Sequence, residues 1–427
     1  MDKGSTVAVI GAGIIGVTSA YMLVQAGFRV VLLDSDEPMK GTSFANAAQL
    51  SFDNADAMAS PALLRKLPAI LLGREPAFRL DWRQSPGWLS WGARFLMQGR
   101  AGSESHNSHY LARLALHSRE QLHALLRVHP LSFHHRCTGR LQIYERAADL
   151  ARAARHIEHK GRWGCRLQLL DRAACLALEP LLSQWRGDWV GGVYAPRDEV
   201  GDAPAFAEGL LALMRETDRL EERYRTRVLR LLIRKRHIEA LATPAGRVEA
   251  DAYVLATGAG GQALVRELGL HLPIYPVKGH SLTVPATARA PEVSVSDVSG
   301  RVVFTRLGER LRVAGGADLV GFDTRPSPKR IGYLLELCRR RLPEAGRYDE
   351  PLHGWAGLRP VTPDSLPIIG RAGADNLYFN LGHGMLGWTL AMGSASLLAA
   401  QIGGQPLPVA SAGFTPQEQG LNSVRFK

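Results

Sequence analysis

Cysteine is scarce in this sequence. The chain has 427 residues and four cysteines, which stand far apart at Cys137, Cys165, Cys175 and Cys338. None of them forms a Cys-x-x-Cys pair, and none shows the spacing of metal ligands. The sequence therefore predicts reduced, buried thiols and no metal site, and it excludes a small disulfide-stabilised scaffold.

Targeting signals and membrane spans are also missing from the pattern. A strand pattern begins at Thr6, which leaves no room for the charged, apolar and cleavage regions of an export signal. The longest uncharged stretch, 381–408, is interrupted by glycines and by His383. Such a stretch suits a helix buried against a cofactor better than a membrane span. We therefore expect a cytoplasmic protein.

Acidic residues are fewer than basic ones. The chain has 40 Asp and Glu against 52 Lys and Arg, which gives a net charge of +12 and a pI near 9.8. The excess is mostly arginine spread through the chain, as expected of either a solvated surface or a face that meets anions. In the segment 61–100, predicted to be irregular, arginines alternate with Trp82, Trp88 and Trp91. This composition favours weak peripheral contact with the inner face of the cytoplasmic membrane.

The length and the 46% hydrophobic content suit two interwoven domains or one large α/β domain. Hydrophobic periodicity predicts strands at Thr6–Ile10 and Arg29–Leu33 around a helix at Ile14–Ala26, which is one βαβ unit. Further helices are predicted at 110–128, 147–159 and 204–215, and further strands at 140–144, 227–233, 238–243, 252–256, 280–284, 302–305 and 310–314. The last three indicate an antiparallel sheet in a second domain.

The motif Gly11-Ala12-Gly13-Ile14-Ile15-Gly16 joins the first strand to the first helix. Gly11 permits the tight turn, Gly13 lets a pyrophosphate approach, and Gly16 lets helix and strand pack closely. Asp34 ends the next strand, where its carboxylate can accept the ribose hydroxyls of an adenosine. The motif and the acid together predict a dinucleotide site for FAD or NAD rather than NADP.

Later segments distinguish FAD from NAD, because a nicotinamide enzyme would continue with regular βα units. The chain instead has glycine-containing segments at 41–47, 357–370 and 382–388. These segments resemble the D-amino acid oxidase superfamily of flavoproteins, and most closely the bacterial D-amino acid dehydrogenase small-subunit family. The resemblance covers nearly the whole chain, including 198–202, 275–279 and 413–416.

The resemblance implies an α/β fold in which a Rossmann-type FAD-binding domain (1–60, 190–265 and 350–405) is interwoven with an α+β substrate domain (61–189 and 266–349). A tail follows at 406–427. The glycine-rich turn at 382–387 would bring a helix N-terminus to the flavin, where its dipole stabilises negative charge. Besides the glycine motif and Asp34, the implied cofactor-binding residues are Thr42, Ser43, Asn46, Ala47, Val228, Ala256, Thr257, Gly258, Gly357, Gly382, Gly384, Met385 and Gly387.

Four residues are candidates for substrate chemistry. By resemblance, Arg359 grips the substrate carboxylate, since a guanidinium forms bidentate, charge-assisted pairs. The alternative is a surface arginine paired with an acid. His383 would tune the electronic properties of the flavin or assist deprotonation of the amine. The alternative is that it only fits the backbone turn between two glycines. His280 and Asp53 stand where the family usually has other residues, so we expect them to shape substrate selectivity.

The leading hypothesis is a dehydrogenase that converts a D-amino acid, including the D-proline or hydroxy-D-proline type, to an imino acid and then a 2-oxo acid. Electrons would pass to a respiratory acceptor such as a quinone. The first alternative is an oxidase of glycine or sarcosine type that uses O₂. The second is an RNA-modifying flavoprotein, which is disfavoured because no RNA-binding motif is present and nucleic acid is not expected as a partner. The oligomeric state is left open.

Overall fold

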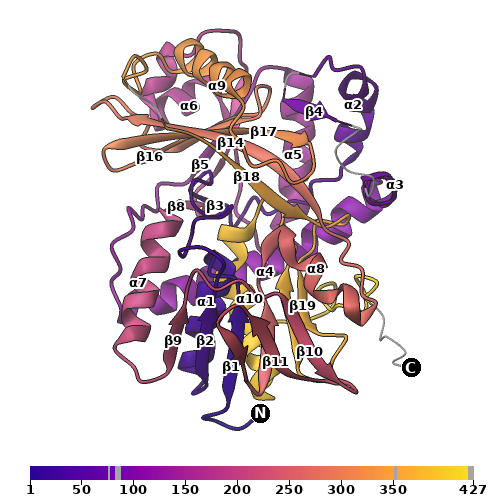
Figure 1. The fold of residues 1–427 in the computed structure, drawn as a ribbon. Helices are drawn as coiled ribbons and strands as arrows, with labels where there is room; N and C mark the ends of the chain where they lie inside the picture. The colour runs from indigo at the N-terminus through magenta and orange to yellow at the C-terminus, as the bar shows by residue number, and fades with distance from the viewer. Residues whose placement is uncertain (76, 82–87, 351–352, 422–427) are drawn as a thin grey trace.

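Two large sheets organise the protein (Figure 1). The computed structural model describes residues 1–75, 77–81, 88–350 and 353–421. A six-stranded sheet occupies the lower part of Figure 1 and a nine-stranded sheet the upper part, and the chain passes between the two parts several times. The predicted combination of a Rossmann-type domain with a domain built on a largely antiparallel sheet is confirmed.

The six-stranded sheet has the order β19-β20-β13-β1-β2-β9. All neighbours pair in parallel except β19 and β20. The bounds of its strands are β1 Thr6–Ile10, β2 Arg29–Leu33, β9 Leu220–Arg223, β13 Ala252–Leu255, β19 Ile368–Arg371 and β20 Leu377–Leu381. The strands of a parallel sheet are buried on both faces, which explains the continuous apolar runs of β1 and β13.

Helices cover one face of this sheet and a small sheet covers the other. The helical side holds α1 Ile14–Gln25, α4 Ala101–Val128, α7 Ala203–Arg215 and α10 Gly387–Gly403, which share one apolar core. The opposite side holds β10 Arg230–Arg234, β11 His237–Thr243 and β12 Gly246–Val248, followed by η2 Gly258–Gly261, α8 Gln262–Val265 and η3 Arg266–Leu268. The strand β1 ends at the carboxyl edge of the parallel strands, and α1 begins at the same edge.

The nine-stranded sheet has the order β18-β14-β17-β16-β15-β5-β7-β6, with β4 paired to β17. The bounds of its strands are β4 Phe78–Leu80, β5 Arg140–Tyr144, β6 Gln168–Asp171, β7 Gly191–Ala195, β14 Tyr275–Pro285, β15 Ser294–Asp297, β16 Val302–Leu307, β17 Arg310–Leu319 and β18 His353–Val361. The helices α6 Arg172–Leu178 and α9 Pro328–Arg341 pack on its outer face, together with η1 Pro180–Gln184. The helix α5 Ala147–Gly161 lies against the opposite face, because a Cβ on Gly191 would meet Leu150 of α5, whereas a Cβ on Gly192 would meet Cys175 of α6. The strands β7 and β18 belong to this sheet, although the expected domain division placed 190–265 and 350–405 with the nucleotide-binding domain.

The segment 61–100 contains two helices, α2 Pro61–Leu71 and α3 Trp88–Gln98, so the prediction of irregular structure is wrong there. Ser60 caps α2 by accepting a hydrogen bond from the Leu63 amide at 3.3 Å, and Pro61 occupies the first turn, where its missing N–H costs nothing. Trp82 and Arg83 lie outside the described residues. Trp91 is buried, and its indole donates to the Val361 carbonyl at 2.9 Å.

Among the described residues, no helix is long and apolar enough to cross a membrane. Within the uncharged stretch 381–408, residues Gly387–Gly403 form α10, which is 17 residues long and buried against α1 and α4. The cysteine prediction is partly wrong, because Cys137 is exposed while Cys165, Cys175 and Cys338 are buried. A short two-stranded sheet of β3 Gln49–Leu50 and β8 Glu199–Val200 links the two large sheets.

Candidate active site

One cavity of about 1470 Å³ is lined by residues of both large sheets. Pockets for single drug-sized ligands measure about 300–1,000 Å³, so this cavity has room for a dinucleotide and a small substrate. Of the predicted site residues, Gly16 and Asp53 do not line it. The others do: Gly11, Gly13, Ile14, Ile15, Asp34, Thr42, Ser43, Asn46, Ala47, Val228, Ala256, Thr257, Gly258, His280, Gly357, Arg359, Gly382, His383, Gly384, Met385 and Gly387.

Two glycines of the motif at the end of β1, Gly11 and Gly16, have no room for a side chain. Gly11 has φ +109°, and a Cβ there would lie 2.5 Å from the Ala256 carbonyl oxygen. A Cβ on Gly16 would lie 1.7 Å from the Gly11 carbonyl oxygen, so Gly16 lets α1 pack on the loop. Gly13 faces the cavity, and a Cβ there would meet the Ser43 hydroxyl at 3.3 Å. The loop therefore forms a cradle at the N-terminus of α1, a place suited to phosphate.

Asp34 joins this cradle to the end of β2. Its Oδ2 accepts a hydrogen bond from the Ala12 amide at 2.6 Å, and its Oδ1 accepts one from the Asp36 amide at 3.0 Å. An ionised carboxylate has about four acceptor positions, so further ones remain for ligand hydroxyls in the cavity. The two backbone amides thus fix the orientation of the carboxylate, and the carboxylate in turn holds the backbone of both loops.

An unpartnered polar atom marks the next part of the wall. The Thr257 hydroxyl is buried, and no described residue supplies it with a hydrogen-bond partner. Thr257 follows β13 and precedes Gly258, which has φ +58°. Buried hydroxyls are normally satisfied, so this one fits a group bound in the cavity. The glycine cradle and this hydroxyl together fit a dinucleotide.

The loop 41–47 crosses from one sheet to the other. The Thr42 hydroxyl donates to the Leu358 carbonyl at 2.7 Å, and Arg312 donates to the Asn46 carbonyl at 3.0 Å. Ser43 accepts a hydrogen bond from the Ile14 amide at 3.1 Å, which places its hydroxyl at the start of α1. The loop therefore connects the phosphate cradle to β17 and β18.

The turn 382–387 brings the N-terminus of α10 to the cavity. Gly382 and Gly384 have φ of +78° and +54°, values that favour glycine. His383 between them is buried, and its Nε2 lies 3.1 Å from the Ser394 hydroxyl. Burial lowers the pKa of His383 to about 3, so the imidazole is neutral at physiological pH. The first turn of α10 has no acidic residue to offset its dipole.

Arg359 extends from β18 across the neighbouring strand β14. A Cβ on Gly279 would lie 2.4 Å from the Arg359 guanidinium carbon, so this glycine makes the space for it. The guanidinium donates to the Gly316 carbonyl at 2.7 Å. No ion pair joins Arg359 to a carboxylate of the described chain, and burial lowers its pKa. The charge is thus only partly compensated, in a position that an anionic ligand can reach.

His280 borders the cavity but leaves β14 on the other face from Arg359. The register pairs Arg359 with Val277 and His280 with Ala356, and side chains alternate between faces along a strand. His280 is 2% exposed, and neither of its ring nitrogens has a hydrogen-bond partner in the described chain. Burial, helped by the charge of Lys278, lowers its pKa to about 4.

Asp53 lies away from the cavity, although the prediction placed it near the substrate. Its carboxylate is fully buried and pairs with Arg197, with distances of 2.5 and 3.1 Å, and accepts from the Arg166 amide at 3.0 Å. Asp56, three residues later, does line the cavity and lies 2.7 Å from Lys160. Burial raises the pKa of Asp56, but Lys160, together with the charges of His156 and Arg140, outweighs burial and holds the pKa below its ordinary value.

Arg140 is a cavity residue that the prediction missed. Along β5, Leu141 and Ile143 face the apolar core while Arg140 and Gln142 line the cavity. Its guanidinium donates to the hydroxyls of Ser296 at 3.0 Å and Ser51 at 3.1 Å. The alternation of polar and apolar residues in 140–144 carried this signal, because it predicts one polar face on a strand that was already identified.

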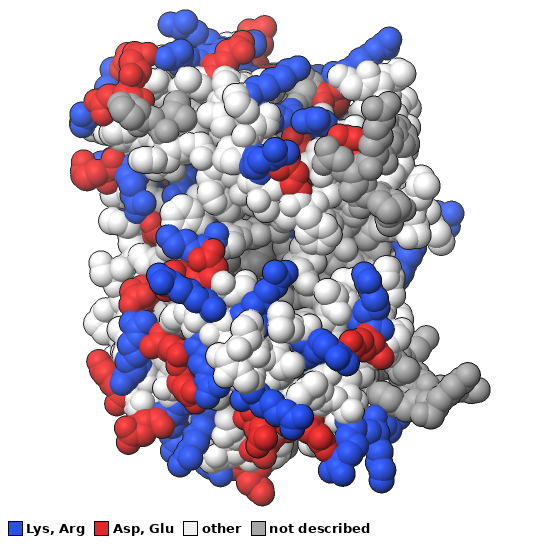
Figure 2. Space-filling model, in the orientation of Figure 1, with Lys and Arg blue, Asp and Glu red and all other residues white. Residues whose placement is uncertain are grey.

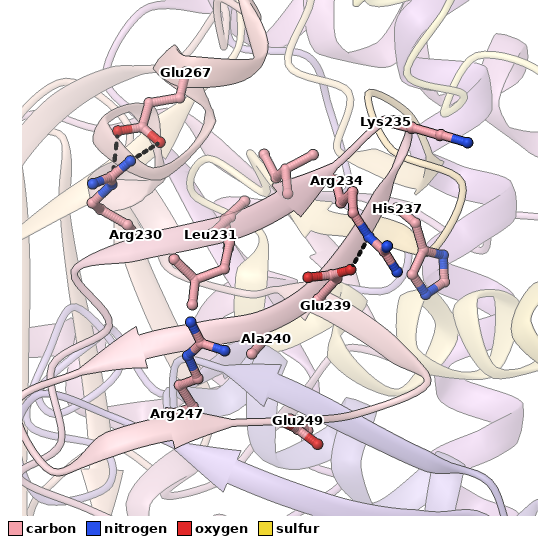
Figure 3. Close-up of a pocket in the computed structure, with 12 residues that line it drawn as sticks. Arg230, Leu231, Arg234, Lys235, His237, Glu239, Ala240, Arg247, Glu249 and Glu267 are labelled. Atoms are coloured by element: carbon pink, nitrogen blue, oxygen red, sulfur yellow. Dashed lines mark hydrogen bonds and ion pairs between the residues drawn. The ribbon is translucent and has the colours of Figure 1, made fainter.

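A second concavity, of about 720 Å³, lies on the three-stranded sheet (Figure 3). Two of its three arginines are paired: Arg230 with Glu267 at 3.1 Å, and Arg234 with Glu239. The larger cavity is the better candidate for the active site, because the glycine cradle and Arg359 both line it.

Comparison with known proteins agrees with this geometry. A protein named D-amino acid dehydrogenase from Paramagnetospirillum magneticum is 40% identical over 418 residues, 96% of this chain and 97% of that protein. Another of that name, from Methylobacterium nodulans, is 40% identical over 410 residues, 95% of this chain and 96% of that protein. Glycine oxidase from Geobacillus kaustophilus has the same fold, with a TM-score of 0.75 and 22% identity over 96% of this chain and 98% of its own. The model of the FAD dependent oxidoreductase family, DAO, matches residues 6–401, and the chain therefore belongs to that family.

Proposed function

We propose that the protein binds FAD and oxidises a D-amino acid as a dehydrogenase. The observation that carries the proposal is that one cavity runs from the glycine cradle of β1 to the guanidinium of Arg359, whose charge is only partly compensated. Asp34 and the Gly11 to Gly16 loop would hold the adenosine and pyrophosphate of FAD, and the start of α10 would face its flavin. When bound, FAD supplies a two-electron acceptor for a hydride from the substrate Cα.

The residues of the chain would bind and orient the substrate. Arg359 would pair with its carboxylate and so fix the position of Cα, since orientation contributes most to a hydride transfer of this kind. No dedicated base is required, because the substrate amine has only to be neutral. His280 and His383 are both neutral, and neither is needed as a charged partner. Water then hydrolyses the imino acid to a 2-oxo acid and ammonia.

The choice of a D-amino acid rests on the relatives, which carry the name D-amino acid dehydrogenase at 40% identity. The glycine oxidase shares the fold, which leaves an O₂-using oxidase as the second candidate. Figure 2 shows Lys and Arg interspersed with Asp and Glu over the visible face, so this face offers no continuous basic surface. That pattern supports a small-molecule substrate over RNA.

Anaerobic flavin reduction tests the proposal. The purified flavoprotein is mixed with D- and L-amino acids, including D-proline and hydroxy-D-proline, and the flavin absorbance is followed. We expect bleaching by D-amino acids and not by their L-enantiomers. Reduced enzyme is then mixed with O₂ or with a soluble quinone. Faster reoxidation by the quinone supports the dehydrogenase, and faster reoxidation by O₂ supports the oxidase. Failure of every amine to bleach the flavin would refute both.

We further propose that a membrane quinone accepts the electrons, and that α2 and α3 bring the protein to the bilayer surface. The two helices lie near one another on the right of Figure 1. They expose the apolar side chains of Leu71, Leu72, Leu89 and Met97, which are 46%, 65%, 63% and 60% accessible. Basic residues at 65, 66, 74, 94 and 100 accompany them, a combination suited to anionic lipid headgroups.

Co-sedimentation with vesicles of mixed anionic and neutral phospholipid tests this surface. Leu72→Glu with Leu89→Glu should abolish binding. Leu169→Glu is the matched control. Leu169 is 51% exposed, and it lies on β6, the last strand in the order of the nine-stranded sheet, and not on α2 or α3. Absence of wild-type binding at low salt, or equal losses in both variants, would contradict the proposal.

A further inference from the structure

A cluster of four potential metal ligands lies outside the cavity. His123 is on α4, His135 and Cys137 follow that helix, and Glu199 is on β8. One ligand atom from each residue lies within 4.8 Å of the other three. Sequence spacing predicted no metal site, because these ligands come from three separate segments of the chain.

Glu199 is the centre of this cluster. Its side chain is fully buried, its Oε1 lies 2.7 Å from His123 Nε2, and its Oε2 lies 2.6 Å from His135 Nε2. The Cys137 thiol lies 3.8 Å from the same His135 nitrogen. Four ligands arranged tetrahedrally around Zn²⁺, at about 2.0–2.3 Å from the metal, are roughly 3.3–3.8 Å apart. Shifts of roughly 1 Å or less would bring the four atoms to that geometry.

We propose that His123, His135, Cys137 and Glu199 form a structural zinc site. Two imidazoles, a thiolate and a carboxylate are the ligand types that Zn²⁺ takes in proteins. Arg119 donates to Glu199 Oε1 at 2.9 Å and would orient the carboxylate from outside the metal's own ligands.

Hydrogen bonds account for the carboxylate and the histidines, whereas only one long contact of 3.8 Å, to His135, involves the thiol. A buried carboxylate is satisfied by Arg119 and two histidines, and a cysteine S–H adds only a weak donor. The backbone nevertheless holds Cys137 at the cluster, since Arg136 and Val200 exchange two hydrogen bonds of 3.0 Å. A sulfur held beside two imidazoles and a carboxylate is what a zinc site requires.

The site would link α4 to the wall of the active-site cavity. Glu199 pairs with Leu50 in the β3–β8 sheet, and the neighbours of Leu50, Gln49 and Ser51, line the cavity. Asp198, beside Glu199, accepts from the side-chain amide of Asn54 at 3.0 Å, and Asn54 also lines the cavity. Bound zinc would therefore stiffen this wall without contacting substrate.

Zinc titration of the tag-free flavoprotein tests the site. The protein is treated with a chelator, dialysed, and titrated with Zn²⁺ against a chromophoric indicator at mildly alkaline pH, because zinc displaces protons from its ligands. We expect one Zn²⁺ per chain and a higher melting temperature. Cys137→Ser and His135→Gln should each weaken binding by more than about 10-fold. His134→Gln, at an exposed neighbour outside the cluster, should bind as wild type does.

Cobalt identifies the ligands directly. Co²⁺ added to wild type should give thiolate-to-metal charge-transfer absorption in a difference spectrum against the metal-free flavoprotein, and Cys137→Ser should lack it. The flavin-to-protein absorbance ratio shows whether each variant is folded. Because Cys137 is exposed, we expect the protein to tolerate its replacement. Failure of wild type to bind one Zn²⁺, or wild-type affinity in Cys137→Ser and His135→Gln, would overturn the proposal. A cobalt spectrum unchanged in Cys137→Ser would likewise place the metal elsewhere.

Discussion

The two sides of the cavity differ in what fixes their residues. On the nucleotide side, glycines at 11 and 16 are required by the backbone itself, because any Cβ would overlap a carbonyl oxygen. On the substrate side, strands β14, β17, β18 and β5 of the nine-stranded sheet form the wall, and a few side chains such as Arg359 on β18 and Arg140 on β5 give it its chemistry. We therefore expect glycine substitutions on the nucleotide side to disrupt folding or cofactor binding by steric overlap. Substitutions on the substrate side should lower activity by removing single charges.

The largest effect is expected for Gly16→Ala. Its new Cβ would lie 1.7 Å from the Gly11 carbonyl oxygen, so α1 would have to separate from the loop. We expect destabilisation above about 4 kcal/mol, seen as loss of soluble protein or of the cooperative melting transition. Gly41→Ala is the control, because nothing lies within 4 Å of its Cβ position, and it should melt as wild type does.

Gly13→Ala separates folding from cofactor binding. A Cβ at Gly13 meets only the Ser43 hydroxyl, at 3.3 Å, so the protein should fold. The methyl group would face the proposed phosphate position, and the flavin-to-protein absorbance ratio should fall. Normal flavin content in Gly13→Ala would contradict the placement of the pyrophosphate.

Arg359→Leu should produce the next largest effect. Removing one member of a buried charge pair costs about 2–5 kcal/mol, which lowers kcat/KM about 30-fold to about 5,000-fold. Flavin content should stay normal, because Arg359 is proposed to bind substrate. Steady-state kinetics and the absorbance ratio measure the two quantities.

Arg140→Leu is the matched comparison for Arg359→Leu. Two serine hydroxyls hold Arg140, whereas a single backbone carbonyl holds Arg359. We therefore expect the smaller loss of kcat/KM in Arg140→Leu. The reverse order would transfer the role of carboxylate anchor to Arg140, and loss of flavin in Arg359→Leu would make Arg359 structural.

Asp34→Ala should weaken FAD retention more modestly. Loss of a charged acceptor for the ribose hydroxyls corresponds to about 1.5–3 kcal/mol, or about 10-fold to 150-fold in the dissociation constant. Flavin release measured by ultrafiltration gives this constant. Asp36→Ala is a neighbouring control, since Asp36 also borders the cavity but is not proposed to hold the ribose. Tight binding of NADPH in place of FAD would contradict the assignment.

The same contrast explains what the sequence could and could not predict. The strands β1, β2 and β5 have their predicted bounds, because alternating or continuous apolar runs determine them locally. The cavity position of the glycine motif followed from the βαβ pattern. Asp53 was misplaced, because only the tertiary fold shows that Arg197 neutralises it. The Glu199 cluster depends on contacts between three distant segments, which spacing alone does not reveal.

His280 should show the smallest effect on catalysis and a distinct effect on stability. Its side chain leaves β14 on the face opposite to Arg359, so His280→Leu should leave the ranking of substrates by kcat/KM unchanged. Its pKa of about 4 in the folded protein lies below the ordinary value of 6.5. The unfolded chain therefore binds a proton that the folded protein does not between these two values, and stability falls as the pH falls through that window.

The charged groups around His280 set the size of this loss. Lys278, Arg330 and Arg359 oppose its protonation and Asp323 favours it, with burial as the main cause. At pH near 5 the cost is about 1–2 kcal/mol, so the melting temperature of wild type should fall between neutral pH and pH 5 by more than that of His280→Leu. Equal acid sensitivity of the two proteins would show that His280 becomes protonated without penalty. A changed substrate ranking would instead place its ring on the Arg359 face of the sheet.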